Sequence, residues 1–157
     1  MAGDSAPYRD AIRTFSRNMG VAFQILNDLG DWIGDDSNKM SAGGDVFGGR
    51  PTLLWALALQ GLPEKDAARL LELAESDCGL SDAERLMQVR KLYEQADVLE
   101  TALKLVDKHQ ARAEKVADEI DVEELRRLLY FLVDTVLERP ELPTPAVVSL
   151  GIAAPLG

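Results

Sequence analysis

Four polar side chains near the start of the chain are spaced to share one face of a helix. They are Gln24, Asp28, Asp31 and Asp35. At about 100° per residue they fall within an arc of about 60°, on a segment that is otherwise rich in apolar residues. Carboxylates three residues apart can share a hard divalent cation, and Mg²⁺ commonly combines one or two carboxylates with substrate phosphates. The stripe suits a diphosphate bound through magnesium, but the spacing by itself does not distinguish such a site from a solvated polar face near a helix end, which is the commoner case.

The glycine-rich segment that follows could bring positive charge to these acids. Residues 41–51 (SAGGDVFGGRP) contain four glycines, which let the backbone approach an anion closely. Lys39 precedes the segment and Arg50 lies within it, and a guanidinium can fork onto phosphate oxygens. The alternative is a connecting loop whose basic side chains pair with nearby acids.

Helical periodicity extends over most of the remaining sequence, while alternating strand patterns are almost absent. The pattern predicts an all-α protein with helices over residues 7–33, 52–61, 63–76, 81–93, 99–120 and 121–139. Ser81 with Glu84, and Asp121 with Glu124, have the spacing of a capping box, so each pair is expected to begin a helix. A break is expected near Gln95.

The long helix predicted over residues 99–120 carries a regular seam for packing against a neighbour. Its members are Leu99, Ala102, Val106, His109, Ala113, Val116 and Ile120, which recur at alternating steps of three and four. On such a seam we expect His109 to be hydrogen-bonded or at the rim rather than catalytic. Trp32 and Trp55 are expected to pack in the core or at an interface.

Composition and charge narrow the class of protein. The chain has 157 residues, is 46% apolar and carries a formal charge of −10, which disfavours nonspecific binding to nucleic acid or to anionic membranes. We expect one helical domain over residues 1–139 and an extended tail over 140–157. Cys78 is the only cysteine, which fits a cytoplasmic location. No signal-peptide pattern or long apolar run is evident, so no membrane span is expected.

Two stretches of the sequence carry a resemblance to a known family. Residues 20–32 (GVAFQILNDLGDW) and 43–59 (GGDVFGGRPTLLWALAL) resemble the second aspartate-rich region of the trans-isoprenyl diphosphate synthases, the polyprenyl synthetase family. The residues that match the family's motifs are Phe23, Gln24, Asp28, Asp31, Asp45, Gly49 and Thr52. Asn27 stands where the family usually has its first aspartate, and Arg50 stands where it has lysine. Lys39 resembles an earlier loop lysine, although its spacing to Asp45 is one residue longer.

The resemblance implies a fold, a cofactor and roles for individual residues. The fold would be about half of the all-α helical bundle of the isoprenoid synthase type. Asp28 and Asp31 would be catalytic and would hold Mg²⁺ on an allylic diphosphate, with Asn27 or Asp35 assisting. The residues that would contact or position the diphosphate are Gln24, Lys39 and Arg50. The reaction would be chain elongation with isopentenyl diphosphate, in which magnesium and cationic groups stabilise the leaving diphosphate and dry apolar walls protect the carbocation.

The resemblance covers only the C-terminal half of a typical family member. The first Asp-Asp-x-x-Asp motif and the arginines that bind isopentenyl diphosphate are not found in the sequence. The chain is therefore interpreted as a fragment of a synthase, one half of a split enzyme or a noncatalytic relative, and the second motif favours material derived from an active synthase. A homodimer, or association with a chain that carries the first motif, would be expected.

Two other functions also fit the sequence. Asn27, Asp31 and Asp35 have the i, i+4, i+8 spacing of a metal motif in class I terpene cyclases. The Phe-Gln pair and the segment through Thr52 favour the prenyltransferase instead. The second alternative is a noncatalytic helical subunit that binds a prenyl synthase through apolar helix faces.

Overall fold

The computed structural model describes residues 6–33, 47, 52–75 and 77–140. These residues form six α-helices and no strand, so the predicted all-α class is confirmed. The helices are α1 (Ala6–Ile33), α3 (Leu53–Gly61), α4 (Glu64–Ala74), α5 (Asp82–Gln95), α6 (Val98–Asp118) and α7 (Glu123–Val136). Within these residues, no helix combines the length and the apolar character needed to cross a membrane.

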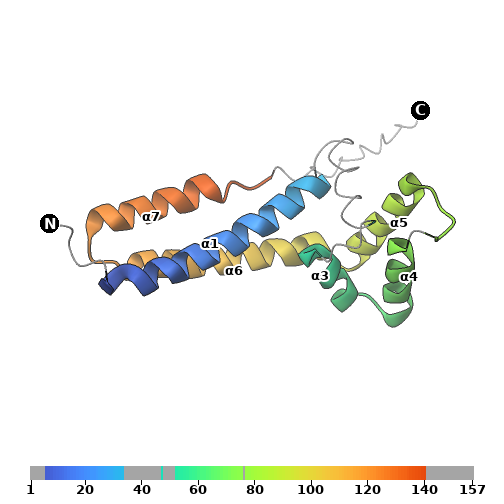
Figure 1. Cartoon of the computed structure of the whole chain (residues 1–157), viewed down its shortest axis with the longest axis horizontal. Coiled ribbons are helices and arrows are strands. Elements are labelled where there is room, and N and C mark those ends of the chain that lie inside the picture. Colours follow the sequence, from blue (N-terminus) through green and yellow to red (C-terminus); the bar gives the residue numbers. More distant parts are fainter. Residues whose placement is uncertain (1–5, 34–46, 48–51, 76, 141–157) are drawn as a thin grey trace, which may run out of the picture.

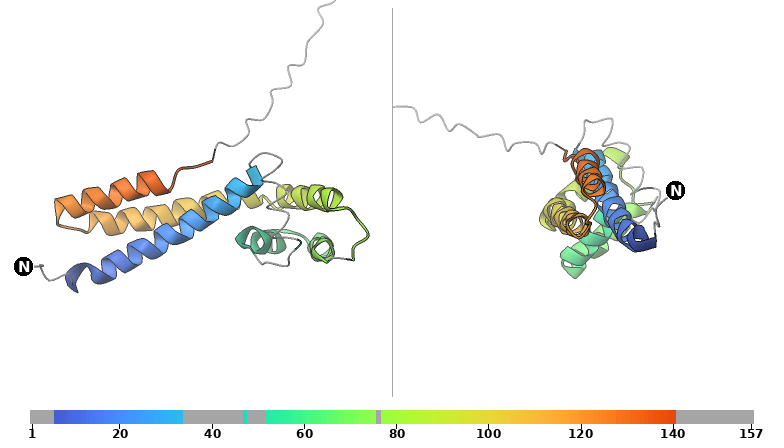
Figure 2. Two further views of the ribbon diagram at one scale, coloured as in Figure 1. Left: turned by 45° about the horizontal axis from the view of Figure 1, so that its top comes forward. Right: turned by 90° about the vertical axis from the view of Figure 1, so that its left-hand side faces the viewer.

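The two longest helices, α1 and α6, form the centre of the molecule. They lie side by side and run in opposite directions, and α7 lies along them (Figure 1). The shorter helices α3, α4 and α5 gather at the end where α1 finishes and α6 begins (Figure 2). This arrangement brings the acidic end of α1 close to the beginning of α3 and to the last turns of α5.

One apolar face of α1 packs against α6. The residues of α1 that are buried on this face include Phe15, Met19, Ala22, Leu26 and Leu29. The facing surface of α6 buries Ala102, Val106 and Ala113, whose small or compact side chains let the two helices approach closely. Three other members of the predicted seam, Leu99, His109 and Val116, are half-buried, so they lie at its edges.

The connection from α4 to α5 is held by two local devices. Ser81 and Glu84 form the predicted capping box: the Ser81 side chain accepts from the Glu84 backbone N–H, and the Glu84 carboxylate accepts from the Ser81 N–H at 2.9 Å. Arg85, only 5% exposed, donates to the Leu73 carbonyl oxygen at 2.7 and 2.9 Å and to the Glu75 carbonyl oxygen at 3.0 Å. The guanidinium thus satisfies carbonyls at the end of α4 that have no partner within the helix.

The predicted break near Gln95 is confirmed. Helix α5 ends at Gln95, and Asp97 adopts a left-handed backbone conformation with φ of 49° before α6 begins at Val98. A non-glycine residue in this region is uncommon, although aspartate tolerates it better than most. The chain therefore changes direction here without a glycine.

The predicted capping box at the beginning of α7 is wrong. The residue that precedes α7 is Val122, and no side chain caps the helix there. The Asp121 carboxylate instead accepts a hydrogen bond from the Tyr8 hydroxyl at 2.6 Å, so a partner on α1 takes the oxygen that a local cap would use. Helix α7 also ends at Val136, three residues before the predicted end at residue 139, and Leu128 of this helix is 52% exposed.

Candidate functional site

The predicted polar stripe lies along the last turns of α1. Gln24 and Asp31 are exposed, and Asp28 is half-buried. The Gln24 amide donates from Nε2 to Oδ1 of Asp28 at 2.9 Å, one helical turn away. This hydrogen bond restricts the orientation of the Asp28 carboxylate. Asn27, also exposed, lies beside the stripe.

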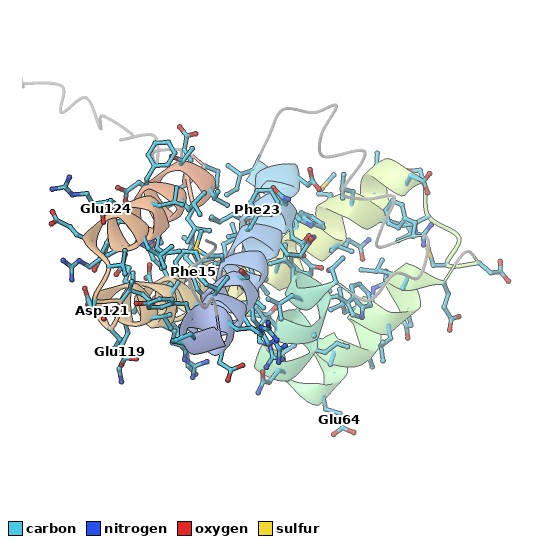
Figure 3. The ribbon with its side chains drawn as sticks, turned by 60° about the vertical axis from the view of Figure 1, so that its left-hand side comes forward. Phe15, Phe23, Glu64, Glu119, Asp121 and Glu124 are labelled. Atoms are coloured by element: carbon cyan, nitrogen blue, oxygen red, sulfur yellow. The ribbon has the colours of Figure 1, made fainter. Side chains whose placement is uncertain are left out.

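Two apolar side chains of α1 are more exposed than the apolar sequence suggests. Val21 is 38% exposed and Phe23 is 45% exposed, although both contribute to the apolar character of the segment. Figure 3 shows Phe15 among the side chains toward α7, and Phe23 farther along α1. Within the described part of the chain, α1 is buried on one face only, because α6 and its neighbours cover one side.

The end of α1 is fixed by contacts with α5. The Arg90 guanidinium donates from Nη2 to the Trp32 carbonyl oxygen at 3.2 Å, which supplies a partner for a carbonyl in the last turn of α1. The rings of Trp32 and Tyr93 are tilted by 43° with their centroids 4.7 Å apart. Trp32 is 8% exposed, so its predicted packing role is confirmed. These contacts set the position of the acidic stripe relative to α5.

A buried tyrosine lies next to Asp28 and the beginning of α3. Burial raises the pKa of Tyr93; the Thr52 side chain opposes this shift, and the negative charge of Asp28 adds to it. Thr52 also caps α3, because its hydroxyl accepts from the Trp55 N–H at 3.2 Å. The Tyr93 hydroxyl has no hydrogen-bond partner within standard geometry in the described structure. Helices α1 and α5 and the residue that caps α3 therefore contribute neighbouring oxygen atoms at this point.

No sequence pattern predicts that Tyr93 or Arg90 belongs to this region. Tyr93 follows the apolar spacing of α5 and resembles an ordinary core residue, while Arg90 resembles any surface cation on an amphipathic helix. Both act across large separations in the chain. No local pattern could have indicated their contact with the end of α1.

The donor chemistry of the stripe fits magnesium. Asp28 and Asp31 offer carboxylate oxygens, and Asn27 and Gln24 offer amide oxygens, all of which are hard ligands. The described residues contain no group of three or more His, Cys, Asp or Glu side chains that could hold a metal by themselves. Two carboxylates suffice only if a substrate phosphate completes the coordination, which is common for Mg²⁺.

Several predicted site residues fall outside the described residues. They are Asp35, Lys39, Asp45, Gly49 and Arg50. The one described position in the glycine-rich segment is Phe47, whose ring lies 4.1 Å from the guanidinium carbon of Arg85. This cation–π contact brings residue 47 to the first turn of α5.

The sequence is similar to those of known isoprenyl diphosphate synthases. It is 28% identical over 140 residues to a short chain isoprenyl diphosphate synthase of Methanothermobacter thermautotrophicus. The aligned residues are 88% of this chain and 42% of that protein. A protein of the same description from Methanocaldococcus jannaschii is 34% identical over 74 residues, or 46% of this chain and 23% of that protein. No solved structure gives a significant match.

A third relative is described as a synthase with a different product. It is an all-trans-nonaprenyl-diphosphate synthase (geranyl-diphosphate specific) of Rhodobacter capsulatus, 26% identical over 133 residues, or 84% of this chain and 40% of that protein. The chain thus spans less than half the length of these relatives. The polyprenyl synthetase family profile matches residues 1–96, which include the whole polar stripe. The chain belongs to the polyprenyl synthetase family.

Proposed function

We propose that this chain supplies the second aspartate-rich motif of a trans-isoprenyl diphosphate synthase. The site binds an allylic diphosphate through Mg²⁺ for chain elongation with isopentenyl diphosphate. The observation that carries the proposal is the pairing of Gln24 with Asp28, one turn before Asp31, on the exposed side of α1 in a member of this family.

The proposed roles follow from the chemistry of each side chain. Asp28 and Asp31 hold the metal, with Asn27 or Asp35 as a further oxygen ligand. When bound, the metal neutralises negative charge that develops on the leaving diphosphate. Gln24 keeps the Asp28 carboxylate oriented through the hydrogen bond at 2.9 Å. Lys39 and Arg50 contact the diphosphate, which balances the excess of acids.

We further propose that the site is completed by association. The partner is a second copy in a homodimer, or a chain that carries the first aspartate-rich motif, in the cytoplasm. Large apolar side chains on two helices support this proposal. Val21 and Phe23 of α1, and Leu128 and Phe131 of α7, are between 38% and 63% exposed. Exposed apolar surface of this kind commonly marks a site of protein–protein contact.

Calorimetric titration with a nonhydrolysable allylic diphosphate analogue, with and without Mg²⁺, tests the function. We expect magnesium-dependent binding that Asp28→Asn and Asp31→Asn each weaken by about tenfold or more, because each removes one carboxylate ligand. Asp10→Asn is the matched control, since it removes one exposed acid of α1 far from the stripe. Binding that does not depend on Mg²⁺, or that is equally strong in all three variants, would contradict the proposal.

A further inference from the structure

A second polar region lies between α1 and α6, toward the beginning of α1. It is a pocket of about 510 Å³ whose lining includes Arg17 and Asn18 of α1 and His109, Arg112 and Lys115 of α6. Glu119 lines its far end, and Figure 3 labels this residue where α6 gives way to α7. The pocket is separate from Asp28 and Asp31, which do not line it.

The charge of this pocket is opposite to that of the chain. Three cations and one acid line it, although the chain as a whole carries a formal charge of −10. Five cations of the described structure form ion pairs, among them Lys104 with Glu100 and Arg127 with Glu123. No ion pair joins Arg17, Arg112 or Lys115 to another described residue. Glu119 is the one acid of this lining, so the three cations leave an excess of positive charge that a bound anion would offset.

The wall of the pocket between these cations is an ordered pair of polar side chains. Asn18 is only 7% exposed, and its amide group donates from Nδ2 to the Thr14 carbonyl oxygen at 2.9 Å. Its Oδ1 lies 2.9 Å from Nδ1 of His109 and therefore accepts a hydrogen bond from the imidazole. This bond turns Nε2 of His109 away from Asn18. His109 is thus fixed in orientation, as the sequence predicted, and lines the pocket.

Burial and the nearby positive charges also act on the histidine. Burial lowers the pKa of His109, and Arg112 and Lys108 lower it further. The positive charges that disfavour a proton on His109 would favour an anion at the same place.

We propose that the pocket between α1 and α6 binds a small, multiply charged phosphate anion. Arg17 approaches the anion from α1, while Arg112 and Lys115 approach it from the next turns of α6. Two guanidinium groups can each donate paired hydrogen bonds to phosphate oxygens, and the ammonium group adds a point charge. The volume of about 510 Å³ leaves room for more than one phosphoryl group. A diphosphate matches three cations better than a monophosphate does.

The single histidine of the chain provides a direct probe of this site. We would titrate the full chain with inorganic diphosphate and follow the His109 ring resonances by NMR, in EDTA and at constant ionic strength set with NaCl. Without divalent cations, the acids Asp28 and Asp31 do not contribute to diphosphate binding. We expect a saturable shift of the His109 resonances, and weaker binding at higher salt.

A pair of variants with equal change in charge makes the test specific. Arg112→Gln with Lys115→Gln should weaken binding about tenfold or more, measured as the diphosphate concentration at half-saturation. The control, Lys104→Gln with Arg127→Gln, removes two exposed cations elsewhere and should leave that concentration unchanged. All four substituted residues are exposed, so both variants should fold.

Three results would overturn the proposal. They are no saturable response, the same response to NaCl alone, and equal affinity in the pocket variant and the control variant.

Sedimentation with vesicles that contain phosphatidate distinguishes a lipid phosphate from a free one. Loss of vesicle binding in the pocket variant alone assigns a lipid headgroup, and a response to soluble diphosphate alone assigns a free ligand. The proposal does not depend on the function of the acidic stripe, since the titration excludes magnesium.

Discussion

The Tyr93 hydroxyl is a buried polar group at the junction of α1, α3 and α5. Its side chain is 3% exposed, and the oxygen has no hydrogen-bond partner in the described structure. Such a group loses its hydration without full compensation, which costs about 1–3 kcal/mol. The ring itself packs against Trp32 and contributes to the core. The ring and the hydroxyl of this residue therefore have opposite effects on stability.

Tyr93→Phe should leave the free energy of unfolding unchanged or raise it by about 1 kcal/mol, because the ring stays and the unpaired hydroxyl is removed. Urea unfolding at pH 7 measures this change. Tyr130→Phe is the matched control. Its hydroxyl donates to Asp118 at 2.6 Å at an exposed site, so its removal should not stabilise the protein. A clear loss of stability in Tyr93→Phe would show that the hydroxyl has a partner.

The same residue predicts a dependence on alkaline pH. The folded state raises the pKa of Tyr93 above its usual value of 10.0, so above that pH the unfolded chain releases a proton that the folded chain retains. The contribution of this shift to the free energy of unfolding is fully present below pH 10. It is lost as the pH rises further, by at most about 1.4 kcal/mol for each pH unit. Urea unfolding between pH 9 and 11 should show a steeper loss for the unchanged chain than for Tyr93→Phe. Parallel curves would contradict this.

At the scale of elements, the joint between α4 and α5 depends on Arg85. Arg85→Met should lower the free energy of unfolding by about 3 kcal/mol, because the Leu73 and Glu75 carbonyls lose a charged donor inside the protein. Urea unfolding measures the loss. Arg127→Met serves as the control, since that side chain is 78% exposed and pairs with Glu123 at the surface. Equal effects of the two substitutions would mean that the α4 carbonyls find other partners.

The capping box of α5 allows a second test at this scale. Ser81→Ala should destabilise the protein by about 1 kcal/mol at pH 7 in urea unfolding. Hydrogen bonds from Ser81 lower the pKa of Glu84, so the contribution is present at neutral pH and is lost as pH falls below the usual value of 4.5. The difference between the two proteins should therefore shrink in acid. Asp121→Ala should not remove a cap from α7, since no side chain caps that helix.

The comparison of these two capping boxes explains which elements could be predicted from sequence. Ser81 and Glu84 interact within one turn, and nothing distant competes for them, so the local pattern was sufficient. Asp121 and Glu124 have the same spacing, but Tyr8 approaches from the far end of the chain and binds Asp121. The ends of the six described helices were predicted within a few residues because signals of this local kind set them. The surroundings of the acidic stripe were not, since Tyr93 and Arg90 reach it only through tertiary packing.

At the scale of the whole molecule, the chain buries one side of its long helices and leaves apolar residues on the other. Helix α7 buries Leu129 and Val133 against the rest of the protein. Leu128 and Phe131, three residues apart and therefore neighbours on the helix surface, are 52% and 63% exposed. Together these two side chains form an apolar surface that the rest of the described chain does not cover.

If α7 presents a contact surface, replacing its exposed apolar side chains should change how the chain associates. Leu128→Gln with Phe131→Gln should shift the chain toward the monomer in sedimentation equilibrium, because removing this apolar area weakens any interface that buries it. Leu71→Gln with Met87→Gln is the control, since these residues of α4 and α5 are 51% and 57% exposed. Stronger dissociation in the control would move the contact surface to α4 and α5. A monomeric unchanged chain would instead mean that the partner is a different chain, because self-association would then be absent before any substitution.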